Sequence, residues 1–432
     1  MDHLSAPTLD ALTAQRLPRA QARPAVLHLL ACSRCQDRLL ELYPFQGRLL
    51  LERLLDEPPE RLEGALRQTR MAMEPKKAWA LRETERAAVL FAELEPLSPA
   101  HRRLRALNSS RFANLSLVAR LLEESRKDWH SEPEEAERWA SLACALVTRV
   151  RQHDLPKEAL TDIAARAWSY LGNSWRVLSS YSRADEALSH AAGILKNGSG
   201  DLKEQAEHRQ FFASLRTLQA RFDEGRQLTL QAQDLYRRAG IVRGVAHMQL
   251  ALATQSHHRR RSQRAVEDLQ VFFRRYSRTQ VGDGLYFMAM QNHVNELVNV
   301  GQTEAAADLL RELRRSSSSV ANAKLLAARL NWTEALVAMG RERLEIADRI
   351  LRQVRQALDH LPCDRALAGL DLSKARLKLG NRQSAVRLAL ESEHVLAAHG
   401  MQHLAREAAA VTKAASTNEN PSQLDGPTST CR

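Results

Sequence analysis

AWSYLGNSWRVLSSYSRADEALSHA, residues 167–191, is the stretch that decides the fold. Trp168 and Trp175 lie seven positions apart, which places both side chains on one face of a helix. A polar turn follows, and the apolar pattern then resumes on a second helix. We expect the two helices to run antiparallel and to approach most closely at Gly172 and Ala184, where only small side chains fit.

Features of this segment recur along the chain. The small residue of the second helix returns about every 40 positions, at Ala184, Gly225, Ala265 and Ala306. The turn between the helices has the same period, at Gly301, Gly340 and Gly380. Periods of this length are typical of repeat proteins, in which each unit packs only on its neighbours and the core grows lengthwise.

The order of a large residue, Leu-Gly, an aromatic residue and then Ala-x3-large-x2-Ala resembles the tetratricopeptide repeat. The resemblance implies an all-α fold, a right-handed superhelical solenoid of helical hairpins, whose inner groove holds a peptide or a helix. The period near 40 is longer than the 34 residues usual for that family. Longer helices would explain the difference.

The domain limits follow from where the repeats begin and end. We expect the solenoid over 111–414 and a helical linker, broken by proline-containing turns, over 46–110. A small helical segment precedes them at 1–45. The polar, aperiodic residues 415–432 are expected to form a disordered tail.

The groove positions of the tetratricopeptide family fall on polar residues in this chain. Carried over repeat by repeat, they are Arg166, Asn173, Arg176, His247, His257, Gln291, Asn292, Asn295 and Asn299. An asparagine amide both donates and accepts hydrogen bonds, which suits an extended peptide backbone. The alternative is that these are exposed polar residues on solvated helices.

Near the N-terminus, His28, Cys32 and Cys35 form the pattern H-x3-C-x2-C. On one helix the spacing i, i+4, i+7 directs all three side chains the same way, and nitrogen and sulfur ligands suit tetrahedral zinc. The alternative is that they continue an apolar helix stripe, with the cysteines buried as small hydrophobic residues.

The segment around these residues, LDALTAQRLPRAQARPAVLHLLACSRC, resembles the zinc-binding anti-sigma factor domain of bacteria. The resemblance implies zinc as cofactor, a sigma factor as partner, and a fourth ligand about one helix upstream. His3 is the candidate for that ligand, because no cysteine precedes Cys32.

The net charge of the chain is compatible with two kinds of partner. Lys and Arg number 63 and Asp and Glu 51, giving a net charge of +12, which suits nucleic acid or another acidic surface. The densest basic run, HHRRRSQR at 257–264, has no interleaved aromatic residues for stacking bases. Arginine-rich helix surfaces explain the charge equally well.

Several classes of protein are not expected. No apolar stretch approaches the roughly 18 residues of a membrane span, and the start lacks the apolar run of a secretory signal. Five cysteines do not form a disulfide framework, so a reduced, cytoplasmic setting is expected. No phosphate-binding glycine loop, nucleophile elbow or H-E-x-x-H appears, so we expect no enzyme.

The first functional hypothesis is a non-enzymatic scaffold or regulator that binds a peptide or helix in the solenoid groove, with a sigma factor as the partner if the N-terminal resemblance is functional. The alternatives are a nucleic-acid-associated regulator that uses the basic solenoid, and an assembly scaffold with a vestigial N-terminal zinc segment.

Overall fold

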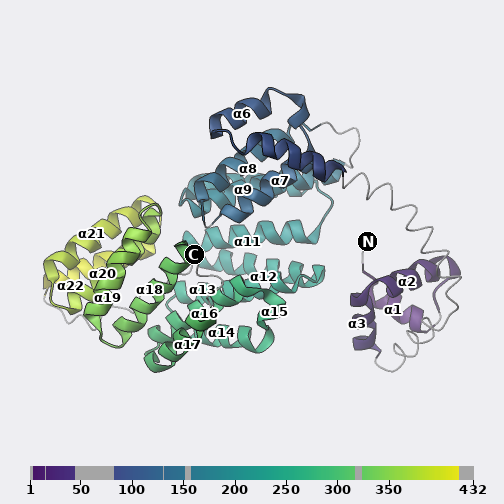
Figure 1. Cartoon of the computed structure of the whole chain (residues 1–432). Helices are drawn as coiled ribbons and strands as arrows, with labels where there is room; N and C mark the ends of the chain where they lie inside the picture. The colour runs from purple at the N-terminus through teal and green to yellow at the C-terminus, as the bar shows by residue number, and fades with distance from the viewer. Residues whose placement is uncertain are drawn as a thin grey trace. The chain divides into compact units, whose positions relative to one another are not determined.

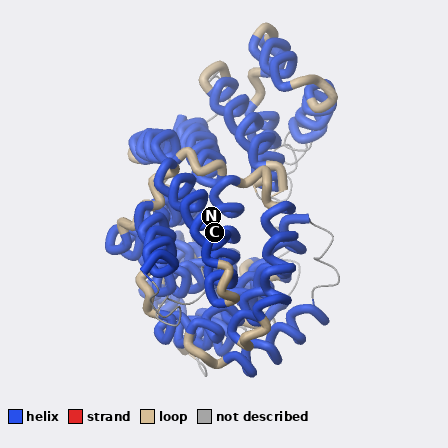
Figure 2. The backbone as a smooth tube through the Cα atoms, turned by 90° about the vertical axis from the view of Figure 1, so that its left-hand side faces the viewer, coloured by secondary structure: helices blue, strands red, loops and turns tan. Residues whose placement is uncertain are grey.

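The computed structural model describes residues 3–14, 16–43, 82–129, 131–150, 157–316 and 324–417. All regular structure in these residues is helical (Figure 2). The chain divides into two compact units, Met1–Thr84 and Glu85–Arg432. Most of the predicted linker and the predicted tail beyond residue 417 lie outside the described residues.

The first unit contains three helices, α1 (Ala6–Thr13), α2 (Arg19–Ala31) and α3 (Ser33–Leu42). The Ser5 side chain caps α1 by accepting a hydrogen bond from the Thr8 backbone N–H. One face of each helix contributes to a single small core, formed by Leu9, Leu12, Ala25, Leu29, Cys35 and Leu39.

The second unit begins earlier than the sequence suggested. A helix over residues 82–94, α6 (Pro99–Leu107) and the short 3-10 helix η1 (Ser110–Phe112) precede the first repeat. Their buried apolar side chains belong to the same core cluster as those of the next two helices. This part of the predicted linker has an apolar face that packs with the first repeat, and it belongs to the same compact unit from Glu85 onward.

Antiparallel helix pairs then follow one another along the chain (Figure 1). The pairs are α7 (Leu115–Asp128) with α8 (Pro133–Val147), α9 (Lys157–Val177) with α10 (Tyr181–Leu195), α11 (Leu202–Leu218) with α12 (Phe222–Ala239), α13 (Val242–His258) with α14 (Ser262–Arg275), α16 (Asp283–Asn299) with α17 (Thr303–Ser316), α18 (Lys324–Gly340) with α19 (Leu344–Ala357), and α20 (Pro362–Lys378) with α21 (Arg382–Ala398). The short α15 (Arg278–Val281) precedes α16, and α22 (Gln402–Thr417) packs on α21. The all-α solenoid is confirmed, and α22 extends three residues into the predicted tail.

The two helices of a pair pack closely at the small residues that the sequence predicted. A Cβ atom built on Gly172 would lie 2.8 Å from Cγ of Leu188 and 3.3 Å from the carbonyl oxygen of Ala184. Gly225 plays the same part in α12, where an added Cβ would meet the Thr217 hydroxyl at 3.0 Å. The repeating small residue is thus a packing requirement of the hairpin.

The turns between paired helices share a backbone feature. One residue in each of the six turns from α9–α10 onward adopts a positive φ, at Ser179, Ala220, Arg260, Gly301, Glu342 and Gly380. Gly301 and Gly380, two of the three glycines that mark the turns in the sequence, occupy this position. Gly340 ends α18, where its lack of a side chain makes room for Thr303, and Glu342 takes the left-handed conformation instead.

Contacts between distant repeats shape the interior of the second unit. The His399 Nδ1 donates to the carbonyl oxygen of Ser179 over 3.2 Å, and Glu407 accepts from Lys374 at 2.5 Å and Arg260 at 3.5 Å. Residues of α18 and α20 also line a space of about 20 Å³ together with residues of α8, α9 and α11. The later helices therefore lie opposite the earlier ones across the interior.

No helix in the described part of the chain combines the length and apolar character that crossing a bilayer requires.

Candidate functional sites

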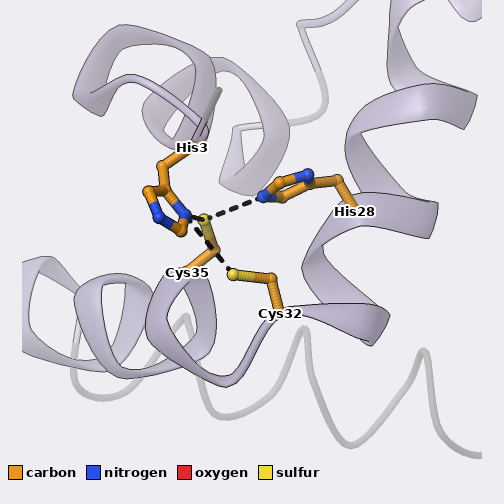
Figure 3. Close-up of side chains that lie close together, drawn as sticks. All are labelled: His3, His28, Cys32 and Cys35. Atoms are coloured by element: carbon orange, nitrogen blue, oxygen red, sulfur yellow. Dashed lines mark hydrogen bonds between the residues drawn. The ribbon is translucent and has the colours of Figure 1, made fainter. Parts of the chain in front are cut away.

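Four predicted ligands meet in the first unit. One nitrogen or sulfur atom from each of His3, His28, Cys32 and Cys35 lies within 4.8 Å of the others. The Nδ1 of His3 is 3.4 Å from the Cys32 Sγ and 3.5 Å from the Cys35 Sγ, and the Nε2 of His28 is 3.3 Å from the Cys35 Sγ. Figure 3 shows the two imidazoles and two thiols turned toward one point.

The convergence does not come from one continuous helix, and that premise of the sequence analysis was wrong. Helix α2 ends at Ala31, Cys32 is extended with φ −123° and ψ 98°, and α3 begins at Ser33. His28 therefore comes from one helix and Cys35 from the next, with Cys32 at the bend. His3 reaches the cluster from the segment before α1.

The separations fit a tetrahedral zinc site. Zinc binds nitrogen at about 2.0–2.1 Å and sulfur at about 2.3 Å, so nitrogen and sulfur ligands on one ion lie about 3.5 Å apart. The three nitrogen–sulfur distances are 3.3, 3.4 and 3.5 Å. Slight desolvation of the exposed ring, followed by the charges of Arg34 and His28, lowers the pKa of His3 and favours the neutral imidazole that binds metals.

The second unit contains an inner cavity of about 190 Å³. Its wall comes mainly from the first helices of successive pairs, α9, α11, α13, α16 and α18, with additions from α12 and from Trp129 after α7. The predicted groove residues that line it are Asn173, Arg176, His247, Gln291 and Asn292.

The other predicted groove residues lie elsewhere. Arg166 donates from Nε to the Glu204 carboxylate over 2.9 Å, which joins α9 to α11, and Asn295 is only 1% exposed. His257 and Asn299 line a second, more polar cavity of about 770 Å³. The carried-over positions thus split between the inner cavity, helix–helix contacts and a separate cavity.

Ion pairs surround the basic run 257–264, which borders the second cavity. His257 Nδ1 lies 2.6 Å from a Glu296 carboxylate oxygen; burial opposes protonation, but the carboxylate outweighs it and raises the pKa of His257. Arg259 pairs with Asp223, and Arg260 with Glu407. Much of this charge is therefore engaged by carboxylates of the same chain.

Three further residues of the inner cavity were not found from the sequence. The indole N–H of Trp129 and the side-chain carbonyl oxygen of Gln255 are buried without a hydrogen-bond partner among the described residues, and both side chains line the cavity. The Gln255 amide group is held in place by donating to the hydroxyls of Thr217 at 3.2 Å and Thr229 at 2.8 Å.

The third missed residue is Arg329 of α18. It lies 38 positions after Gln291, so extending the groove pattern by one more repeat would have identified it. No repeat signal marks Trp129, which follows the end of α7.

Three arginines influence the titration of His247 in the cavity wall. The pKa of His247 falls to about 4, first through burial and then through the charges of Arg243, Arg176 and Arg126. His247 is therefore neutral at pH 7 and available for hydrogen bonding as a neutral ring.

Comparison with known proteins supports the fold alone. No protein-family model and no curated protein matches this chain. Among solved structures, a Rap protein complexed with Competence and Sporulation Factor is similar at 12% identity and a TM-score of 0.52, over 67% of this chain and 79% of that one. Aspartyl phosphate phosphatase F from Bacillus subtilis (12% identity, TM-score 0.49, 91% and 95% covered) and the apo form of RapI (9%, 0.47, 68% and 98%) are also similar.

Proposed function

We propose that this protein is a binding regulator whose inner cavity receives a short stretch of extended peptide. The observation that carries the proposal is that Trp129 and Gln255 line the cavity and that each has a buried polar atom, the indole N–H and the side-chain carbonyl oxygen, without a hydrogen-bond partner among the described residues. Leaving a buried donor or acceptor unpaired costs about 1–3 kcal/mol, so a ligand that satisfies both is favoured. A peptide unit offers one acceptor and one donor.

The composition and size of the cavity support a short segment. Amide and hydroxyl side chains such as Asn173, Gln210 and Asn292 stand beside the apolar Phe211 and Leu250. A volume of about 190 Å³ is smaller than the roughly 300–1,000 Å³ of typical small-molecule pockets. The cavity would thus hold one or two residues, with the rest of the peptide outside it. The similar Rap structure was solved in complex with a factor.

Affinity selection of a pentapeptide library on the full chain tests this proposal. We expect enrichment of defined peptides on the wild type and its loss in Ala251→Phe, because Ala251 lines the cavity and a phenyl ring would fill it. Gln227→Phe, on the exposed side of α12, is the matched control and should bind normally. Trp129→Phe should weaken binding about 3- to 10-fold by removing one donor. Equal enrichment on the wild type and Ala251→Phe would refute the proposal.

We propose a second function for the first unit: a zinc-stabilised module that binds a sigma factor. The four-ligand cluster of His3, His28, Cys32 and Cys35 favours the metal, and the resemblance of this segment to anti-sigma domains favours the partner. The core of this unit is small, and domains of about 40 residues commonly need a metal or a disulfide to fold. Zinc would join the start of the chain to α2 and α3.

Metal analysis of the full chain, purified under reducing conditions without chelators, tests the module. We expect about one zinc per chain, lost in the Cys32→Ser and Cys35→Ser double variant and kept in Cys144→Ser, a cysteine of the second unit. A sigma factor from the source bacterium should co-purify with the wild type and not with the double variant. Zinc-free wild-type protein would disprove the metal site, and zinc-loaded protein that retains no sigma factor would disprove the partner alone.

A further inference from the structure

The inner cavity has an excess of positive charge. Two guanidinium groups line it, from Arg176 on α9 and Arg329 on α18, and its wall contains no aspartate or glutamate among the described residues. The two arginines come from different helices, and both also line the adjoining space of about 20 Å³.

The two arginines are held differently. Arg176 is 9% exposed, and its Nε donates to the Asn173 Oδ1 at 2.9 Å, which orients the guanidinium. Arg329 is partly buried, and its backbone carbonyl accepts a hydrogen bond from Gln291 at 3.0 Å. Its side chain makes no ion pair with the residues that the structure describes.

One carboxylate lies nearby, outside the main cavity. Asp364 of α20 lines the adjoining 20 Å³ space, together with Arg176 and Arg329. One negative charge against two positive ones leaves a net charge of about +1 at this end of the cavity. A charged group that is removed from water and lacks a full counter-charge destabilises the protein. A bound anion would supply the missing counter-charge and offset that cost.

We infer that Arg176 and Arg329 anchor a carboxylate of the bound peptide, either its C-terminus or an aspartate or glutamate side chain. A guanidinium meets a carboxylate through two parallel N–H···O bonds, which are shorter and stronger than neutral hydrogen bonds. A single negative charge matches the local excess of +1, whereas a phosphate dianion would exceed it. This inference rests on the proposed peptide-binding function and specifies the ligand class.

Four synthetic forms of the best peptide from the library selection test the anchor on the full chain: the unmodified peptide, a C-terminal amide, a form with its acidic side chains changed to amides, and a form with both changes. Isothermal titration should show a loss of about 10- to 100-fold for the modification that removes the anchoring carboxylate. Loss on C-terminal amidation identifies the terminus, and loss on changing the acidic residue identifies the side chain.

Variants of the protein supply the matched comparison. In Arg329→Gln, the affinity for the unmodified peptide should fall by a similar factor, and the affinity for the doubly amidated form should fall little. Arg226→Gln removes a charge from the exposed side of α12 and should change neither affinity. If all four forms bind equally, the anchor is wrong while the peptide-binding function stands. If no peptide is enriched at all, the proposed function itself fails.

Discussion

A buried histidine predicts how acid destabilises the second unit. His208 of α11 is 5% exposed and lies 3.1 Å from the Ser169 hydroxyl. Burial first, and then the charge of Arg209, lowers its pKa from 6.5 to about 4. Because the folded pKa is depressed, a proton favours the unfolded chain. The stabilising contribution is complete above pH 6.5 and is lost as pH falls toward 4, at about 1.4 kcal/mol per pH unit.

The His208→Gln variant isolates this contribution. Glutamine keeps a hydrogen-bonding group near Ser169 but cannot take up the proton. The difference in free energy of unfolding between wild type and variant should shift by about 2.5 kcal/mol in favour of the variant between pH 7 and pH 4.5. Urea unfolding followed by circular dichroism measures it. His190→Gln, at an exposed position of α10, should follow the wild type. A constant difference between wild type and His208→Gln across this range would refute the argument.

Four further results are expected. Trp332→Phe removes the indole N–H that donates to the fully buried Asp371 carboxylate at 2.9 Å, and urea unfolding should show a loss of about 2–3 kcal/mol. Gly172→Ala should cost about 1–3 kcal/mol in the same assay, because its Cβ would meet Leu188. Glu342→Gly should raise stability by up to about 1 kcal/mol by relieving a left-handed φ of 59°. A zinc chelator should accelerate hydrogen exchange in the first unit and leave the second unchanged; equal exchange would contradict a structural metal.

The hairpin stack could be predicted because its signals are local. Gly172 and Ala184 are 12 positions apart, and their contact depends only on two adjacent helices. The turns were less predictable for a physical reason. Glycine takes a positive φ at little cost, yet any residue can do so where the surrounding helices compensate, as Ala220 and Glu342 do here. A search for glycine therefore identified Gly340, two residues before the true turn position.

The inner cavity could be predicted only in part, because it depends on contacts between distant repeats. The groove positions carried over from the tetratricopeptide family identified Asn173 on α9 and Gln291 on α16. The repeat pattern could not show that α18 lies opposite α9 across the interior. This arrangement places Arg329 in the same cavity wall as Arg176. The curvature that does this is a sum of small rotations between neighbouring repeats, and no short motif encodes it.

The four residues of the predicted metal site lie close together, although the premise of one continuous helix was wrong. On one straight helix, His28 and Cys35 would be separated by about 10 Å along the axis, too far for ligands of a single ion. The extended backbone of Cys32 turns α3 away from the direction of α2, and the Nε2 of His28 then lies 3.3 Å from the Cys35 sulfur (Figure 3).

The apolar alternative explains the two cysteines and not His3, because Cys32 is partly buried and packs against the small core. Cys35 is 1% exposed and belongs to the small core, as that alternative requires. His3 is exposed and contributes nothing to that core, yet its Nδ1 lies within 3.5 Å of both sulfurs. Apolar packing gives no reason for an exposed imidazole to meet two thiols, whereas a tetrahedral ion requires such a fourth ligand. The position of His3 is therefore the strongest structural argument for a metal in the first unit.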